Sequence, residues 1–119
     1  MCLALKGFLT TDKSMGGYMI ESSGQFFDWD EDKNLLNIEK HGISFSEAST
    51  VFEDNNAVFV YDEAHSISEE RFIIVGFSGF PRLLMVCHCY RKDGEIIRII
   101  SARKATEPEE LLYENGGVF

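Results

Sequence analysis

The chain has 119 residues, of which 45% are hydrophobic, so it is long enough to bury the core of one compact domain and short for two. No apolar run approaches the roughly 20 residues that a membrane-spanning helix needs, and the opening MCLALKGFL lacks the small-residue cleavage site of a secretion signal. We therefore expect a cytoplasmic protein with no membrane partner.

The formal net charge of −9 is distributed unevenly along the chain. Residues 1–70 have a net charge of −10, residues 71–104 of +5 and residues 105–119 of −4. Because cellular salt screens charges beyond about 8 to 10 Å, a local basic surface can bind an anion that the whole molecule would repel. The acidic segments suit a basic protein partner, and the two kinds of partner are compatible.

Residues 1–24 contain Gly16, Gly17 and Gly24 with scattered Ser and Thr and show no clean periodicity, so we expect a poorly ordered N-terminal extension. Residues 25–119 are expected to form a single domain. The odd number of cysteines, three, argues against a disulfide framework. Cys87 and Cys89 flank His88 on one expected strand, where the three side chains cannot all turn toward one metal ion. We expect core thiols and neither a metal nor a cofactor.

A helix is predicted over residues 31–41. The acidic run at 30–32 (DED) suits a helix N-terminus, and Gly42 supplies a left-handed end. The apolar stripe of this helix consists of Leu35, Leu36 and Ile38.

Two capping boxes mark two further helices. Ser44 and Glu47 predict a helix that begins at once and ends near residues 53–56. Thr106 and Glu109, with Pro108 in the first turn, predict a short last helix.

Between these helices, four runs rich in Val, Ile and Phe predict strands over residues 57–61, 71–77, 82–91 and 95–102. Hairpin-length connections at 78–81 and 92–94 join the last three strands as an antiparallel meander. We therefore predict an α+β fold with two N-terminal helices, a four-stranded antiparallel sheet and a short C-terminal helix. Residues 26–29 are expected to add a short N-terminal edge strand.

The stretch 95–104 (EIIRIISARK) holds one guanidinium, that of Arg98, on a stiff strand. Strict alternation puts Arg98 on the face of Ile96 and Ile100, and Ser101 on the opposite face. Arg103 and Lys104 follow just past the expected strand end, within reach of the same extended polyanion. An Arg in mid-strand is equally typical of the outward side of an edge strand.

Four segments together resemble the BrnT family of bacterial toxins: FDWDEDKNLLNIEKHGISFSEASTVF, EERFIIVG, RLLMVCHCYR and IRIISARKAT. The resemblance covers roughly residues 26–114, and the combination of KHG before a capped helix with ISARKA after a strand is its specific part. It implies a RelE-like fold and a ribonuclease of a type II toxin-antitoxin pair that cleaves RNA and stops translation. It also implies a neighbouring antitoxin of the BrnA type, whose ribbon-helix-helix part binds operator DNA. The long N-terminal extension and the strong acidity depart from the family pattern.

Metal-free RNA cleavage uses the 2′-hydroxyl as nucleophile and needs proton transfer and stabilisation of charge on phosphorus. Arginine suits the second task, because its planar fork binds phosphate oxygens in pairs. We expect Arg71, Arg98 and Arg103 at the scissile phosphate. Arg71 can instead pair with Glu69 or Glu70, and Arg103 can instead dock the last helix.

Several further candidates have two interpretations. His88 shares an expected face with Arg82 and Tyr90, and either exchanges a proton or is a core residue. Tyr90 either stacks on a base or is half-buried, and Arg82 and Lys104 are expected RNA contacts. His41 either interacts favourably with the helix C-terminus or takes part in catalysis, and His65 lies in an acidic loop where we expect it to be solvated.

Two functions therefore stay open, beside a third, an RNA-binding protein that uses its sheet and has no antitoxin. The first is an endoribonuclease toxin. The second is a non-catalytic module that uses the acidic helices of residues 31–53 to bind a basic antitoxin or DNA-bound partner.

Overall fold

The structure of the chain, a computed structural model, describes residues 17–22 and 24–118. These residues form one six-stranded mixed sheet with the strand order β1-β2-β6-β5-β4-β3. The strands are Gly17–Ser22 (β1), Gln25–Asp30 (β2), Val58–Tyr61 (β3), Phe72–Phe77 (β4), Leu83–Arg91 (β5) and Ile96–Lys104 (β6). The α-helices are Glu31–His41 (α1), Phe45–Ser49 (α2) and Glu107–Glu114 (α3), and the 3-10 helices are Thr50–Glu53 (η3), Glu63–His65 (η4) and Lys92–Gly94 (η5).

This architecture corrects the predicted fold class. We predicted two N-terminal helices followed by a four-stranded antiparallel, RelE-like sheet, whereas β1 and β2 precede the helices and extend the sheet to six strands. Residues 26–29 belong to β2, which is not an edge strand because it pairs antiparallel with β1 and parallel with β6. The parallel pair joins Phe26 to Ile96, and a contact so distant in sequence leaves no local pattern.

The edge strand β1 lies within residues 1–24, for which we predicted an extension of low order. It pairs with β2 through a turn in which Gly24 has φ +81°, a conformation that favours glycine. Residues 1–16 and 23 lie outside the described part of the chain.

Helix α1 has the predicted bounds. The Asp30 side chain accepts hydrogen bonds from the N–H groups of Asp32 and Lys33, and Gly42 ends the helix with φ +71°. The expected apolar stripe faces outward, however: Leu35 and Leu36 are 57% and 62% exposed. The helix docks through two buried asparagines instead.

These asparagines, Asn34 and Asn37, bond backbone groups of β6 and of residues 43–45, which follow α1. The Asn37 amide donates to the carbonyls of Ile43 and Ala102 at 2.8 Å each and accepts from the Ala102 N–H at 3.1 Å. Asn34 accepts from the Phe45 N–H at 2.8 Å. A periodicity search for apolar residues misses this arrangement, because the docking side chains are polar.

Helix α2 begins as its capping box predicts, but only half of the box forms. Ser44 accepts from the Glu47 N–H at 3.0 Å, whereas the Glu47 carboxylate turns to Arg82 and Ser78. The helix is short and continues as η3, which crosses β4. At the other end of the chain, both halves of the Thr106–Glu109 box are present in α3.

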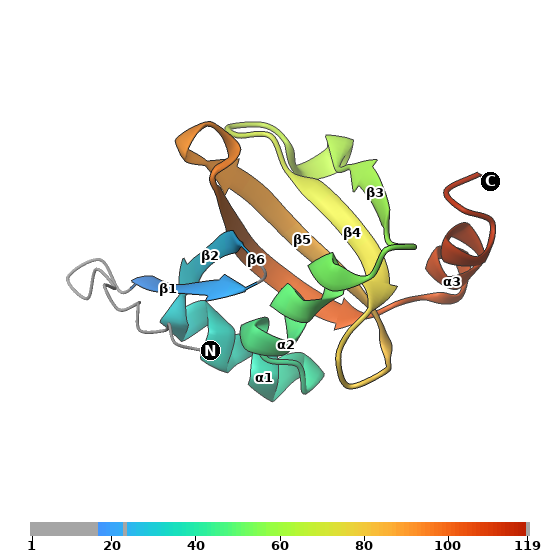
Figure 1. Cartoon of the computed structure of the whole chain (residues 1–119), viewed down its shortest axis with the longest axis horizontal. Coiled ribbons are helices and arrows are strands. Elements are labelled where there is room, and N and C mark those ends of the chain that lie inside the picture. Colours follow the sequence, from blue (N-terminus) through green and yellow to red (C-terminus); the bar gives the residue numbers. More distant parts are fainter. Residues whose placement is uncertain (1–16, 23, 119) are drawn as a thin grey trace.

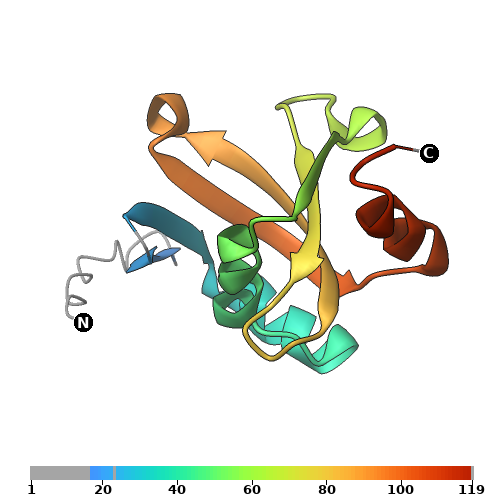
Figure 2. The same ribbon diagram turned by 45° about the vertical axis from the view of Figure 1, so that its right-hand side comes forward.

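The sheet has one face covered by α1, α2 and η3, which we call the helix face (Figures 1 and 2). The core lies between this face and the helices and consists of Phe27, Trp29, Ile43, Phe45, Ala48, Val51, Ile74, Leu84, Val86, Ile97, Ile99 and Ala102. Helix α3 packs beside β4 through an edge-to-face contact of Tyr113 with Phe77. No helix in the described residues is long and apolar enough to cross a membrane.

Candidate catalytic face

The face of the sheet opposite α1 and α2 carries Arg71, Arg98 and Arg103, and we call it the arginine face. Directly paired residues of neighbouring strands point to the same face. Arg98 pairs with Asp28 on β2 and with Cys89 on β5. Arg71 precedes Phe72, which pairs with His88, so its side chain extends toward Cys89 on the same face.

A β-bulge brings Arg103 to this face. In a regular strand, Arg98 and Arg103 are five residues apart and would point to opposite faces. The register shift at Cys87/His88 leaves Ile100 as the extra residue of β6, so Ser101 pairs with Cys87 and Arg103 with Met85. The bulge therefore places Ser101 on the arginine face, which corrects our alternation prediction. Bulges often re-aim side chains next to functional sites.

Arg71 and Arg103 line one cavity of about 280 Å³ on this face. Its other lining residues are Asp62, His65, Ile73, Met85, Cys87, Ile100 and Ser101. Arg98 lies on the same face outside this lining. The structure thus brings together two of the three predicted arginines in one concave site and places the third on the surface beside it.

The three guanidinium groups differ in how far carboxylates already engage them. Arg103 makes two hydrogen bonds of 2.9 Å to the Glu109 carboxylate, and Arg98 is 3.4 Å from Asp28 Oδ1. Arg71 is only loosely paired, with Nε 3.9 Å from Glu69 Oε2. That Nε is buried and has no hydrogen-bond partner among the described residues. Of the three guanidinium groups, that of Arg71 is therefore the least engaged by a carboxylate.

His65, which we expected to be solvated and did not predict as a site residue, lines this cavity. Its Nδ1 lies 3.1 and 3.2 Å from the Asp62 carboxylate oxygens, while its side chain is 69% exposed at the edge of the cavity. A carboxylate on Nδ1 orients the ring and leaves Nε2 for another group. The signal in the sequence was the spacing of Asp62 and His65 in a turn (DEAH) just after a strand.

Burial raises the pKa values of one acid and two thiols on the arginine face. It raises the pKa of Asp28 above its ordinary value, and Arg98 offsets only part of the effect. Burial likewise raises the pKa of the Cys87 thiol to about 11 and that of Cys89 above its usual range. Both thiols therefore stay protonated at neutral pH, which suits core packing and not nucleophilic attack.

The predicted residue His88 points to the helix face, away from the arginines. Its side chain is fully buried, with ring centroids 4.9 Å from Phe52 and 5.4 Å from Tyr90. Burial lowers the pKa of His88 to about 4, so the imidazole is neutral at physiological pH. Its Nε2 is buried without a hydrogen-bond partner in the described part of the chain.

The other predicted contacts are also dispersed. Tyr90 lies on the helix face and is 40% exposed. Arg82 is held by both oxygens of Glu47 and by the Gly42 carbonyl, so it joins the β4–β5 connection to the start of α2. Lys104 belongs to β6 and pairs with Leu84, so its exposed side chain leaves on the helix face.

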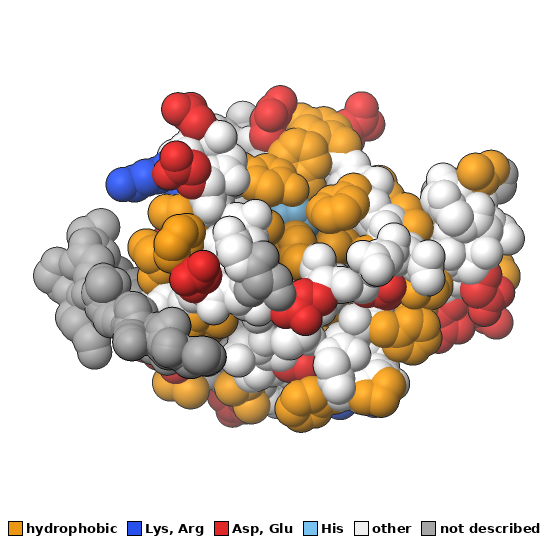
Figure 3. Space-filling view, in the orientation of Figure 1, with side chains coloured by type: hydrophobic (Ala, Val, Ile, Leu, Met, Phe, Trp, Pro, Cys, Tyr) orange, Lys and Arg blue, Asp and Glu red, His pale blue; other side chains and the backbone are white. Residues whose placement is uncertain are grey.

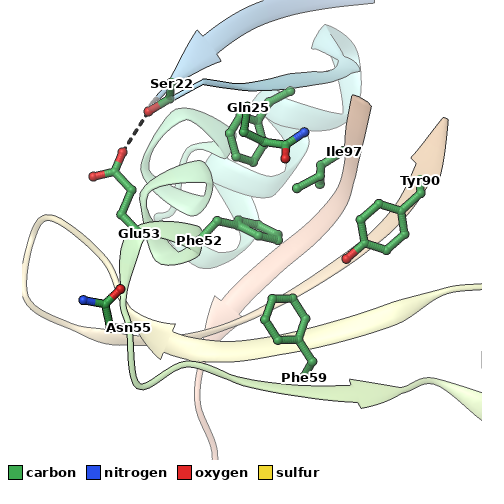
Figure 4. A pocket seen from close by; sticks show the side chains of 9 residues that line it. Ser22, Gln25, Phe52, Glu53, Asn55, Phe59, Tyr90 and Ile97 are labelled. Atoms are coloured by element: carbon green, nitrogen blue, oxygen red, sulfur yellow. Dashed lines mark hydrogen bonds between the residues drawn. The ribbon is translucent and has the colours of Figure 1, made fainter. Parts of the chain in front are cut away.

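A second concave surface, which we call the aromatic pocket, lies on the helix face above His88. Its volume is about 490 Å³, and its lining consists of Ser22, Gln25, Phe27, Phe52, Glu53, Asn55, Phe59, Tyr90 and Ile97. Figure 4 shows the rings of Phe52, Phe59 and Tyr90 directed toward a common space from three different elements. The Ser22 hydroxyl donates to Glu53 at 2.8 Å across the rim.

The described residues contain no group of three or more His, Cys, Asp or Glu side chains that could hold a metal ion. Cys87 and Cys89 point to the arginine face and His88 to the helix face, so the CHC sequence does not converge on one point.

Comparisons with known proteins agree on one family. The model of the family described as the ribonuclease toxin, BrnT, of type II toxin-antitoxin system matches residues 29–109. Among solved structures, the chain is similar to the 1.1 Å crystal structure of the Brucella abortus ribonuclease toxin BrnT, with 25% sequence identity and a TM-score of 0.52. That match covers 66% of this chain and 94% of the Brucella chain. A comparison with curated protein sequences finds no match.

Proposed function

This chain belongs to the BrnT family of ribonuclease toxins of type II toxin-antitoxin systems, and from this premise we propose that it is a metal-independent endoribonuclease acting at the cavity of the arginine face. The observation that carries the proposal is the meeting of Arg71, Arg103 and the His65–Asp62 pair around one cavity.

In the proposed reaction, His65 Nε2 accepts the proton of a 2′-hydroxyl as its oxygen attacks the adjacent phosphorus. The bond from phosphorus to the 5′-oxygen breaks, and that oxygen takes a proton, from the imidazolium or from water. The products are a 2′,3′-cyclic phosphate and a 5′-hydroxyl. Asp62 holds and orients the ring through Nδ1, as a carboxylate does beside other catalytic histidines.

The arginines stabilise the transition state. The guanidinium of Arg71 is only loosely paired, 3.9 Å from Glu69, and Arg103 retains donors that Glu109 does not use. Cations that are preorganised around the phosphate oxygens stabilise the transition state most strongly where water is excluded. Arg98 lies beside the cavity and extends the positive surface along the RNA backbone.

The same premise implies a protein antitoxin. We propose that it is a basic protein of the BrnA type with a ribbon-helix-helix part, and that the complex binds operator DNA. Free toxin then arrests translation by cleaving RNA.

The test is an RNA cleavage assay with purified protein in EDTA. We expect cleavage to leave 2′,3′-cyclic phosphate ends, and a 2′-deoxy substitution at the cleaved nucleotide to block it. His65→Ala should lower the rate about 10²-fold, the usual contribution of one acid–base group. His41→Ala is the matched control, because His41 is an exposed histidine at the end of α1.

Cleavage of the 2′-deoxy substrate, or loss of cleavage in EDTA, would contradict the mechanism. A His65→Ala protein that is folded and fully active would remove His65 from it and leave the arginines to be tested separately.

A second candidate is a non-catalytic binding module. The ion pairs of Arg98 with Asp28 and of Arg103 with Glu109 favour it, because each carboxylate already neutralises a guanidinium that a phosphate would need. Purified protein that cleaves no mixed RNA between about pH 5 and 9, yet binds the antitoxin tightly, would support this alternative.

A further inference from the structure

The helix face carries a cluster of partly exposed aromatic rings where α1 and α2 do not cover it. Phe59 is 55% exposed, and Tyr61 and Tyr90 are also exposed. Phe72 contacts both Tyr61 and Tyr90, with ring centroids 5.4 Å apart in each case, so the cluster is continuous across β3, β4 and β5. Contiguous exposed apolar surface of this kind marks an interaction site more often than scattered apolar residues do.

The cluster surrounds a hollow and is not a flat surface. The aromatic pocket has a volume of about 490 Å³, enough for large side chains of a partner. Figure 3 shows the hollow among hydrophobic side chains, with acidic side chains around it and few Lys or Arg. Beneath the rings lies His88, whose neutral imidazole adds no positive charge.

The charge around the cluster selects the kind of partner. Glu53 lines the aromatic pocket, and Glu70 lines an adjoining depression with Phe72 and Tyr90. The cation in these two linings is Arg91, and its Nη1 is 2.8 Å from Glu69 Oε1. An RNA backbone would meet net negative charge here, whereas a segment with Lys or Arg beside an apolar anchor would find complementary charge.

We propose that the aromatic pocket is the docking site of the antitoxin, which inserts apolar or aromatic side chains between Phe52, Phe59 and Tyr90 and places neighbouring Lys or Arg side chains against the acidic rim. This inference rests on the proposed function for the identity of the partner. It separates the two activities in space, because the antitoxin binds the helix face while RNA is cleaved on the arginine face. Aromatic anchors in a pocket with charged groups at the rim are the common anatomy of a protein interface.

The test measures the dissociation constant of the purified antitoxin for the full-length chain carrying Arg71→Ala, which permits production of a toxin. Adding Phe59→Ala should raise the Kd at least tenfold, because a pocket anchor is lost. Adding Glu53→Lys should raise it several-fold and weaken its dependence on salt. Leu36→Ala is the control: Leu36 is equally exposed but lies on α1, and its replacement should change the Kd less than twofold.

RNA cleavage by the otherwise unchanged chain with Phe59→Ala is measured in parallel and should equal that of the wild type. Values of Kd within twofold for both pocket variants would overturn the proposal, as would a loss of affinity confined to Leu36→Ala, which would place the interface on α1. A fall in RNA cleavage with Phe59→Ala would make the pocket an RNA site and also overturn it. A chain that never cleaves RNA but whose antitoxin affinity depends on Phe59 would refute the nuclease function alone.

Discussion

The arginine face and the aromatic pocket lie on opposite sides of the same strands, yet their chemistry differs in almost every respect. Adjacent residues supply the two surfaces: Arg71 and Phe72 point to opposite faces, as do Cys89 and Tyr90. A strand needs only alternation to separate a cationic surface from an apolar one. A small domain can therefore present two binding surfaces without a second domain.

The two surfaces also differ in how their polar groups are satisfied. On the arginine face each cation has a carboxylate nearby, so local neutrality is nearly reached and the acidic chain tolerates the cluster. On the helix face, His88 sits without a charge partner and is kept neutral by burial. Disrupting the first surface should change catalysis, and disrupting the second should change binding and acid stability.

The largest expected effect separates the two surfaces directly. Arg71→Ala should lower the rate of RNA cleavage about 10³-fold, because it removes a preorganised cation from the transition state. Arg71→Lys should recover only part of the rate, since a single ammonium cannot replace the fork. The antitoxin affinity of both variants should stay within twofold of the wild-type value. Single-turnover kinetics measure the cleavage rate, and calorimetry measures the affinity. Equal losses of cleavage and antitoxin binding would mean that the faces are not independent.

The next effect concerns the stability of the protein in acid, which depends on His88 beneath the aromatic pocket. The pKa of His88 is lowered to about 4 by burial, while the unfolded chain titrates near 6.5, so between these values the unfolded state binds more protons. Stability from this residue is complete above about pH 6.5 and is lost as the pH falls, by about 3 kcal/mol at pH 4. His88→Phe should unfold less readily at pH 4 than the wild type and differ little at pH 7. Urea melts across this range measure the change.

The control is His41→Gln, which should keep the acid sensitivity of the wild type because His41 is exposed. Carboxylates whose pKa is lowered in the folded state, such as Glu47 through its hydrogen bond from Arg82, act at lower pH and affect all variants alike. An unchanged pH dependence in His88→Phe would show that His88 does not titrate as a buried neutral ring.

Local sequence signals predicted the elements whose ends are set by their own side chains. The bounds of α1 follow from Asp30 and Gly42, and the start of α3 from Thr106 and Glu109. The pairing of β2 with β6 could not be predicted in this way, because the residues of neither strand indicate by their local pattern which distant strand they pair with. The same applies to α1, where Asn37 docks the helix by hydrogen bonds that no apolar pattern reveals.

The candidate site was predictable only in its residue types. Arginines in alternating strands indicated a phosphate-binding face, but strict alternation from Arg98 put Ser101 on the wrong side. The bulge at Ile100 corrects this, and a bulge depends on the register of the neighbouring strand. His65 was missed because its pairing with Asp62 arises from the turn of η4, and an isolated histidine in an acidic loop has no periodic signal.

The smallest expected effect tests whether Arg103 belongs to the catalytic face or only docks α3. Burial alone raises the pKa of Glu109, but hydrogen bonds from Arg103 and Thr106 outweigh it and hold the pKa below its ordinary value. Glu109→Gln should keep the capping box, since Gln also serves there, and should lose the charge on which the Arg103 pair depends. The free energy of unfolding should fall by roughly 0.5 to 1 kcal/mol, the usual range for a partly exposed pair.

The released guanidinium should lower KM for RNA about twofold, whereas Glu110→Gln, on the exposed side of the same helix, should change neither quantity. An unchanged KM for Glu109→Gln, with Arg103→Ala also at the wild-type rate, would assign Arg103 to the docking of α3 and leave Arg71 as the principal cation of the arginine face.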